Sequence, residues 1–252
     1  MSLLEATEIT KTFAGITALD QVSLDVEPGE IVGLIGPNGA GKTTFFNCLL
    51  GMLKPDRGTV RFAGKDLSRV PTHRRARLGI GRTFQRIELF AEMTPREHLF
   101  IAERVRRGDG ALWKDLLGRG RPKPDELERV EETIALLGLD DVADRPIEAL
   151  SLGRGRIVEV GRALMTQPTL LLLDEPSSGL DHHETLELAK KLRKVSAARG
   201  AAILLVEHDV EMVRSLVSRV FVLDFGTLIA SGPTDEVFSQ PAVRRAYLGD
   251  VV

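Results

Sequence analysis

The 252-residue chain contains little of what marks secreted or membrane-spanning proteins. Cysteine occurs once, at Cys48, so no disulfide can form within the chain, which fits a reducing compartment. The most apolar stretches, Leu170–Leu173 and Ala201–Val206, are far too short to span a bilayer. Acidic residues enter at once in the opening MSLLEATEIT, and no basic segment precedes a long apolar run, so we expect no signal peptide. We therefore expect any membrane role to come from docking onto another protein.

A strong charge of one sign is also missing. The formal net charge is −2, which argues against a general affinity for nucleic acid. Hydrophobic residues make up 43% of the chain and charged residues 28%, as in a soluble globular protein with an ample core. A chain of this length suits one large domain or two modest ones.

Hydrophobic patterning predicts an α/β chain that opens with short strands. Val22, Leu24 and Val26 alternate with polar residues, Ile31–Ile35 is a compact apolar run typical of a buried strand, and Gly58–Phe62 predicts another strand. After residue 150, three apolar runs alternate with helical segments, which predicts a largely parallel sheet covered on both faces. These runs are Thr169–Leu173, Ala202–Val206 and Val220–Leu223.

The middle of the chain has a helical pattern. Thr94–Glu97 is a capping box with proline at the first helical position, so a helix should begin there. A second helix is expected over Asp125–Leu137, ending at Gly138. Between them, Arg106–Lys123 is rich in glycine, arginine and lysine and is interpreted as an exposed excursion. This region therefore predicts a helical insertion in the α/β chain.

The phosphate-binding loop pattern is matched completely by Gly36-Pro37-Asn38-Gly39-Ala40-Gly41-Lys42-Thr43. Glycines let backbone N–H groups turn inward around a polyphosphate, Lys42 adds positive charge at the β and γ phosphates, and Thr43 offers a hydroxyl to Mg²⁺. The alternative is a glycine-rich turn before a helix. The apolar strand in front and the helix behind favour the phosphate loop.

Two carboxylates follow the apolar run that begins at Thr169. A buried strand would deliver Asp174 and Glu175 to its C-terminal edge, where ligands collect in open α/β sheets. Asp174 would hold Mg²⁺ through water, and Glu175 would polarise the attacking water. An acidic pair at a strand end is often only a solvated turn or a helix cap. The phosphate loop upstream favours the functional interpretation.

Three weaker signals lie elsewhere. His208 follows another apolar run at the same predicted sheet edge, which favours a γ-phosphate contact over a structural histidine. Leu150–Arg154 precedes a helix, whose N-terminus is a ready anion site, although an ordinary N-cap is the alternative. Gln85, at the join between the first α/β block and the helical insertion, means little by itself.

In this order, the motifs resemble those of the ATP-binding subunits of ABC transporters over essentially the whole chain. The resemblance implies that Phe13 stacks on adenine and that Gly36–Thr44, with Thr44 included, is the Walker A loop. It implies that Gln85 is the Q-loop glutamine, which senses Mg²⁺ and the membrane partner. It also makes Leu150–Arg154 the signature motif, with Ser151 and Gly153 at the phosphate.

The same resemblance assigns the remaining motifs. Asp174-Glu175 ends the Walker B strand, Ser178–Asp181 is the D-loop with Asp181 at the nucleotide, and His208 is the switch histidine. The implied catalytic set is Glu175, His208, Gln85 and Lys42. The implied Mg²⁺ set is Thr43, Gln85 and Asp174.

The signature departs from the common LSGGQ. Leu152 replaces a glycine and Arg154 a glutamine, while Ser151 and Gly153 are kept. We therefore expect activity.

Within the ABC ATPases, the chain is most similar to an ATP-binding chain of branched-chain amino acid importers. The carrying residues are Gly81–Gln85 followed by Glu88-Leu89-Phe90, Leu112-Trp113 in the basic excursion, and Ala246-Tyr247-Leu248-Gly249. Relatives serving urea, short amides or aromatic acids would share these features.

The resemblance implies a single ABC ATPase domain over residues 1–252. Its α/β core, with an N-terminal antiparallel β-subdomain, would comprise 1–86 and 153–252, and its helical subdomain 87–152. ATP and Mg²⁺ are the implied cofactors, and the implied location is peripheral, on the cytoplasmic face of the inner membrane. The implied partners are transmembrane permease subunits, a second ATP-binding subunit of the same or a related chain and, indirectly, a solute-binding protein.

Other functions fit less well. An ATPase of lipopolysaccharide export would have a similar sequence. Soluble ABC proteins of DNA repair carry long coiled-coil insertions and those of translation usually carry two ATPase units, and this sequence has neither. A P-loop kinase would have no use for Ser151, Gly153 and His208 in this arrangement.

Overall fold

The N-terminal part of the chain forms a four-stranded antiparallel sheet in the order β2-β1-β4-β5. The structure, a computed structural model, describes residues 2–83, 89–107 and 123–248. The four strands are β1 (Leu4–Phe13), β2 (Ile16–Val26), β4 (Arg57–Phe62) and β5 (Lys65–Asp66). At 10 and 11 residues, β1 and β2 are longer than the short strands that the sequence predicts. Their pairing shifts register around Glu8 and Gln21, both at positive φ, so the alternation of apolar and polar residues slips along the strands.

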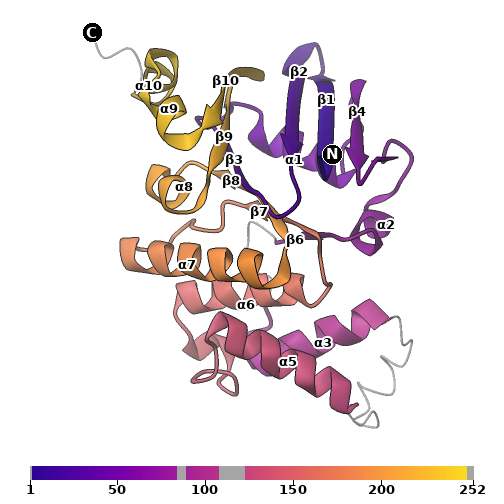
Figure 1. Cartoon of the computed structure of the whole chain (residues 1–252), viewed down its shortest axis with the longest axis vertical. Coiled ribbons are helices and arrows are strands. Elements are labelled where there is room, and N and C mark those ends of the chain that lie inside the picture. Colours follow the sequence, from indigo (N-terminus) through magenta and orange to yellow (C-terminus); the bar gives the residue numbers. More distant parts are fainter. Residues whose placement is uncertain (1, 84–88, 108–122, 249–252) are drawn as a thin grey trace.

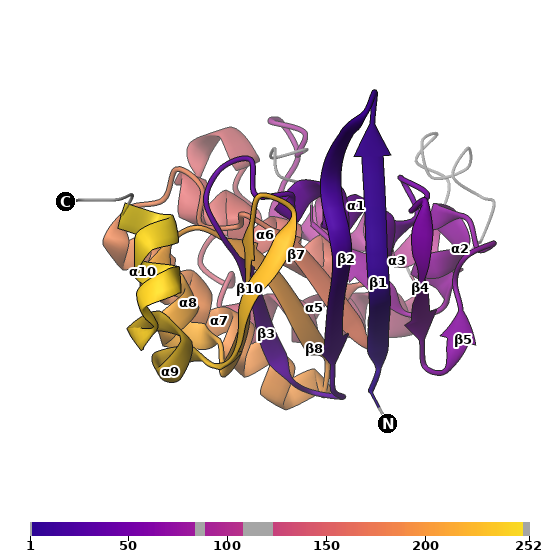
Figure 2. The same ribbon diagram turned by 90° about the horizontal axis from the view of Figure 1, so that it is seen from above.

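Six strands form the second sheet, in the order β10-β9-β3-β8-β7-β6. They are β3 (Ile31–Ile35), β6 (Ile80–Arg82), β7 (Leu170–Asp174), β8 (Ala202–Glu207), β9 (Arg219–Asp224) and β10 (Thr227–Pro233). All neighbours pair in parallel except β10, which is antiparallel to β9. The largely parallel sheet is therefore confirmed, and Figure 2 shows the N-terminal strands standing beside it.

Helices form the rest of the regular structure in the described part of the chain. They are α1 (Lys42–Leu50), α2 (Thr72–Arg77), α3 (Pro95–Arg107), α5 (Pro124–Leu137), the 3₁₀ helix η1 (Ile147–Ala149), α6 (Leu152–Leu164), α7 (His182–Arg199), α8 (Val210–Leu216), α9 (Thr234–Ser239) and α10 (Pro241–Leu248). α1 contacts both β1 and β2 of the first sheet and β8 of the second. α6 and α7 lie below the second sheet, with α3 and α5 farther down (Figure 1).

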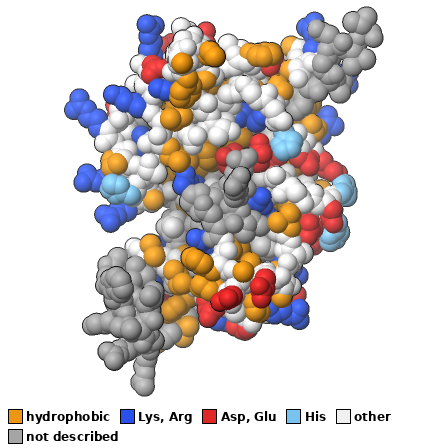
Figure 3. All heavy atoms as spheres, turned by 180° about the vertical axis from the view of Figure 1, so that it is seen from behind, with side chains coloured by type: hydrophobic (Ala, Val, Ile, Leu, Met, Phe, Trp, Pro, Cys, Tyr) orange, Lys and Arg blue, Asp and Glu red, His pale blue; other side chains and the backbone are white. Residues whose placement is uncertain are grey.

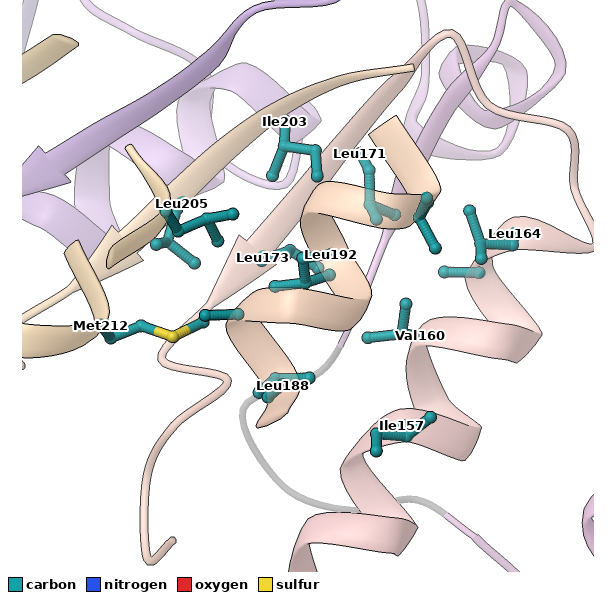
Figure 4. Close-up of a cluster of buried hydrophobic side chains, with 14 of the residues drawn as sticks. Ile157, Val160, Leu164, Leu171, Leu173, Leu188, Leu192, Ile203, Leu205 and Met212 are labelled. Carbon is teal, nitrogen blue, oxygen red and sulfur yellow. The ribbon is translucent and has the colours of Figure 1, made fainter. Parts of the chain in front are cut away.

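The second sheet is buried on both faces, because alternate side chains enter two separate cores. In β7, Leu171 and Leu173 pack into one core, whereas Leu170 and Leu172 enter the other. Figure 4 shows the first core, where Leu192 of α7 lies against Leu173. Burial on both faces explains why these strands are continuous apolar runs rather than alternating patterns.

Helix boundaries in the middle of the chain follow the predicted signals. The backbone N–H of Thr94 donates to Glu97 Oε2 at 2.8 Å, and Thr94 Oγ1 accepts from the Glu97 N–H at 3.2 Å, which confirms the capping box. α5 ends at Gly138, whose φ of 62° confirms the predicted stop. α3 continues through Arg107, so the basic segment expected to be an excursion from Arg106 begins as helix. The rest of that segment, 108–122, lies outside the described residues.

α3, α5 and α6 pack on one another, and α5 and α6 contact α7 beneath the sheet. The predicted architecture is thus confirmed: an α/β core, an N-terminal antiparallel sheet and inserted helices. None of the helices in the described part of the chain is long and apolar enough to cross a membrane.

Candidate nucleotide site

A glycine-rich loop joins β3 to α1. Gly36 has a φ of 152°, and a Cβ there would lie 2.1 Å from the backbone oxygen of Leu223, so only glycine fits. Gly39 has a φ of 82° with open space around it. Gly41 is the N-cap of α1, so the first free N–H groups of that helix belong to this loop. The loop has the tight, glycine-dependent backbone that a polyphosphate cradle requires.

Lys42 is held inside this loop with only 5% of its surface exposed. Its Nζ donates to the carbonyl oxygens of Gly36, at 2.7 Å, and Pro37, at 2.9 Å. Burial lowers the pKa of Lys42, while the negative charges of Glu175 and Asp174 act in the opposite direction. The ammonium is therefore fixed by the loop's own backbone, within the electrostatic reach of the predicted catalytic carboxylate, Glu175, and the predicted Mg²⁺ ligand, Asp174.

A pocket of about 210 Å³ opens at the loop. Its lining residues are Ala18, Asn38, Gly39, Ala40, Gly41, Lys42, Thr43, Thr44 and Glu175. The structure therefore brings most of the predicted phosphate loop together with Glu175, a residue more than 130 positions later in the chain. Gly36 and Pro37 complete the loop as the acceptors for Lys42.

Asp174 and Glu175 stand at the end of β7, at the same edge of the sheet. Asp174 is 9% exposed, and burial raises its pKa to about 6, with the charge of Glu175 adding to the rise and Lys42 opposing it. Glu175 has a φ of 45°, which is uncommon for a residue with a side chain, and its N–H donates to the Val206 carbonyl at 2.8 Å. Neighbouring structure must hold Glu175 in this unfavourable conformation.

His208 lies just beyond the end of β8 and faces this turn. Its Nδ1 is 3.8 Å from Glu175 Oε1 and 3.9 Å from Glu207 Oε2, and its side chain is half exposed. The structure thus brings the predicted switch histidine to the predicted base.

Glu207 is a residue at this edge that sequence patterns do not single out. It is fully buried, and it accepts hydrogen bonds from Ser177 and from the backbone N–H groups of His208 and Asp209. In the sequence, the signal that could have identified Glu207 is its place as an acidic residue directly after a fully apolar run.

The signature segment lies where α6 begins, next to the start of α7. Ser151 is the N-cap of α6, and its Oγ accepts from the Arg154 N–H at 3.3 Å. The Gly153 N–H donates to Glu184 Oε1 at 3.2 Å, and the Glu184 N–H donates to Asp181 Oδ1 at 2.8 Å. Ser151, Gly153 and Asp181 therefore form one group. Among described residues, the lining of the phosphate-loop pocket includes no member of this group.

The two signature departures have partners within the chain. Arg154 donates to the Gly138 carbonyl at 2.7 Å and pairs with Asp141 at 3.3 Å, which ties α6 to the end of α5. A Cβ on Gly179 of the D-loop would lie 3.0 Å from Leu152 Cδ2, so Leu152 packs against that loop.

Two predicted site residues remain, Phe13 and Gln85. Phe13, beside the turn between β1 and β2, is 43% exposed, with Lys11 Nζ 5.4 Å from its ring centre. It is a surface aromatic, and it is not part of the pocket lining in the described chain. Gln85 lies outside the described residues.

The residues at the loop fit a magnesium ion that arrives with a nucleotide. Over 2–83, 89–107 and 123–248, no group of three or more His, Cys, Asp or Glu side chains could hold a metal by itself. Mg²⁺ does not need such a cage, because it keeps several waters and binds one or two carboxylates plus substrate phosphates. Thr43 in the pocket lining and Asp174 at the adjacent strand end supply suitable oxygen donors.

Fold and site together define a P-loop ATPase of the ATP-binding cassette type. Residues 19–178 match the family described as ABC transporter, and residues 227–252 match the family described as branched-chain amino acid ATP-binding cassette transporter. The chain is 39% identical, over 98% of both chains, to the high-affinity branched-chain amino acid transport ATP-binding protein LivG of Escherichia coli strain K12. It is therefore an ATPase that belongs to the ABC transporter family, within the group of branched-chain amino acid transport ATP-binding proteins.

Two further proteins show the same similarity. The lipopolysaccharide export system ATP-binding protein LptB of Haemophilus influenzae is 35% identical, covering 99% of this chain and 98% of that protein. The solved ADP conformation of MJ1267, an ATP-binding cassette of an ABC transporter, matches with a TM-score of 0.86 at 34% identity. That match covers 99% of this chain and 100% of the solved chain.

Replacing Asp174 with asparagine should stabilise the nucleotide-free protein near neutral pH, because the folded state no longer holds a desolvated charge. The folded pKa of about 6 lies above the ordinary value of 3.8, so wild-type stability falls as pH rises through this window. Asp174→Asn should therefore raise the free energy of unfolding by about 1–3 kcal/mol above pH ~6, with the gain vanishing below pH ~4. Urea unfolding without Mg²⁺ or nucleotide, at about pH 4 and pH 7.5, measures it.

Asp66→Asn is a control of opposite sign. Asp66 is an exposed residue of β5, and hydrogen bonds from the Ser68 hydroxyl and backbone N–H lower its pKa. Its substitution should therefore reduce stability at neutral pH. A gain at Asp174 that is the same at both pH values would contradict the electrostatic explanation.

Proposed function

We propose that this ATPase is an ATP-binding subunit of an importer for branched-chain amino acids or similar small solutes. The match of residues 227–252 to a branched-chain amino acid family and the name of the LivG relative support this substrate class. Lipopolysaccharide export is the second candidate because of the LptB relative. The C-terminal match favours import. A soluble ABC ATPase without a transport role is less well supported, since both of these relatives are named for transport or export systems.

The observation that carries the catalytic proposal is the shared pocket of Glu175 and the loop that ends in Lys42 and Thr43. The loop would bind the ATP phosphates, with the Lys42 ammonium moving from the Gly36 and Pro37 carbonyls to the β and γ phosphates. Glu175 would accept a proton from the attacking water, and His208, 3.8 Å away, would contact the γ-phosphate.

Two supporting groups complete the proposal. Phe13 would stack on the adenine, since its ring is exposed and stacking needs no specific base edge. Thr43, Gln85 and Asp174 would hold Mg²⁺, which neutralises developing phosphate charge when bound.

Lys42→Ala and Glu175→Gln should fail differently. Lys42→Ala removes a charge that holds the phosphates, so ATP binding should weaken by about tenfold or more. Glu175→Gln keeps the shape of the side chain but cannot accept the proton, so ATP should bind normally while the kcat for phosphate release falls by about a hundredfold or more. ATP binding and phosphate release by the full chain measure both effects. Reconstituted with its permease, Glu175→Gln should also abolish uptake of labelled leucine.

Different outcomes test the catalytic role of Glu175, the type of reaction and the solute class separately. Near wild-type hydrolysis by Glu175→Gln rejects its catalytic role. Phosphorylation of a small molecule without release of free phosphate indicates a kinase. Hydrolysis by the wild type without leucine uptake rejects the solute class and leaves the ATPase intact.

The separation of the Ser151, Gly153 and Asp181 group from the pocket supports a site shared between two ATP-binding subunits. We propose that each ATP is bound by the phosphate loop of one subunit and the signature of the other. The second subunit would be this chain again or a related one. Closing the pair around ATP would move the helical subdomains, which would push on the permease.

Ser151→Arg should interfere with the ATP bound by the partner subunit rather than with the ATP bound by its own subunit. The bulky side chain should block closure sterically, even though its charge attracts phosphate. In the Glu175→Gln background, ATP should produce a dimer on gel filtration, and adding Ser151→Arg should abolish that dimer while monomer ATP binding persists. Loss of monomer binding as severe as in Lys42→Ala would place Ser151 in the same subunit's site. If Glu175→Gln alone stays monomeric, pairing with a related chain is indicated, and that partner is added to the assay.

A groove between the core and the inserted helices suits the permease. Its volume is about 340 Å³, with Arg82 and Thr83 on the core side and Phe90, Ile101 and Val105 on the helical side. Figure 3 shows an indentation at the left edge of the molecule, between its upper part and the helical part below, with hydrophobic side chains on the lower side. The division into a core, 1–86 and 153–252, and a helical subdomain, 87–152, stays a proposal, which a groove between the two parts supports.

We propose that a permease helix docks here, near the expected contact at 85–90. This docking would hold the subunit peripherally on the cytoplasmic face of the inner membrane. The solute-binding protein would be reached only indirectly, through the permease.

Phe90→Asp should weaken docking without impairing the ATPase. Phe90 is 68% exposed at the groove and is fixed by a hydrogen bond from its N–H to His98 Nε2 at 3.0 Å. A carboxylate there should cost an apolar contact, so co-purification with the permease should fall by about tenfold or more. Leu127→Asp is the control, because Leu127 is also exposed on the helical layer but lies outside the groove lining. Equal loss in both variants, or in neither, would point to another docking surface.

A further inference from the structure

Glu207 joins two loops that approach the site from different strands. It is the last residue of β8 and is 0% exposed. Its Oε1 accepts from the Ser177 N–H at 2.9 Å and the Ser177 hydroxyl at 2.6 Å. Its Oε2 accepts from the backbone N–H groups of His208, at 3.1 Å, and Asp209, at 3.3 Å. One buried carboxylate therefore satisfies four donors from two loops.

These loops carry the proposed base for the attacking water, Glu175, and the proposed γ-phosphate contact, His208. Ser177 follows Glu175 by two residues, and Glu175 is held in a left-handed conformation that needs external support. The other loop carries His208, whose Nδ1 is 3.8 Å from Glu175 Oε1. In addition, Glu207 pairs across the sheet with Ile35, the residue that precedes the phosphate loop. The side chain thus sits where three strand ends meet.

We propose that Glu207 is a positioning residue for ATP hydrolysis, one that sets the Glu175 carboxylate and the His208 ring relative to each other. This inference rests on the proposed catalytic roles of Glu175 and His208. Glu207 is buried beneath both loops, so it acts through them and does not itself touch the nucleotide.

The chemistry requires a carboxylate. All four contacts use Glu207 as an acceptor, and three of the donors are backbone N–H groups that cannot reverse their role. A glutamine offers one acceptor oxygen and one donor nitrogen. It can therefore satisfy one loop, and it turns an N–H toward the other. Glu207→Gln should release one loop while leaving the phosphate-binding loop in place.

The test compares Glu207→Gln with Glu103→Gln in the full chain. Glu103 is also 0% exposed and accepts from Arg106, Arg107 and Arg129, but it lies on α3, away from the pocket lining. Glu207→Gln should lower kcat by about tenfold or more with the Kd for a non-hydrolysable ATP analogue within about twofold of wild type. Glu103→Gln should lower the midpoint of thermal unfolding by about as much as Glu207→Gln does, and it should change kcat by less than about twofold.

A double-mutant cycle with His208→Ala identifies action through the loops. If Glu207 works by placing His208 and Glu175, the double variant should lose little more activity than the more impaired single variant. Losses that multiply, an unchanged kcat in Glu207→Gln, or a kcat loss equal to that of Glu103→Gln would each overturn the proposal.

Ser177→Ala keeps the test decisive if Glu207→Gln does not fold. It removes only the hydroxyl contact, so kcat should fall by about two- to fivefold with the same analogue Kd, and an unchanged kcat contradicts the proposal. If the proposed ATP hydrolysis through Glu175 is itself wrong, the results differ from these. In that case the wild type releases no phosphate, or Glu175→Gln remains active.

Discussion

Parallel pairing of β3, β8 and β7 is the constraint on which the site depends. Because the strands run in the same direction, their C-terminal ends meet at one edge, and the register sets Ile35 beside Glu207 and Val206 beside Asp174. The phosphate loop, the acidic turn and the switch loop each begin at one of these ends. The pairing itself is secured by two cores, one on each face, so the relative position of the three loops follows from burial of Leu, Ile and Val side chains.

The site gathers negative charge where a polyphosphate is expected. Asp174, Glu175 and Glu207 all act on Lys42, and the first of them is deprived of water. Phosphates can enter such a place only with compensating positive charge, which the Lys42 ammonium, the start of α1 and a divalent cation supply together. The conformation of Glu175 adds a backbone cost. The charges and the backbone conformation at this edge therefore reduce the free energy of unfolding below what packing alone would give. Such costs are common where proteins perform chemistry.

The local sequence predicts those parts of the fold and site that depend on neighbouring residues. The loop from Gly36 to Thr43 needs glycines at fixed spacing, and the cap at Thr94 and the stop at Gly138 are set by neighbouring residues. Tertiary features were not predictable in the same way. The pairing of β1 with β2 shifts register along its length, and β10 adds an antiparallel edge to the second sheet. Glu207 becomes part of the site only because the turn at Ser177 packs on it, a contact between residues 30 positions apart.

Two glycines of the phosphate loop differ in mutational tolerance. At Gly36 the obstacle to a Cβ is the backbone oxygen of Leu223, and no side-chain rotation can relieve a clash between backbone and Cβ. At Gly39 the space is open, and only the left-handed φ disfavours a side chain. Asparagine tolerates that conformation better than other residues do. A side chain at position 39 would therefore meet no protein atoms but would lie at the pocket proposed for the phosphates, while position 36 is closed to every other amino acid.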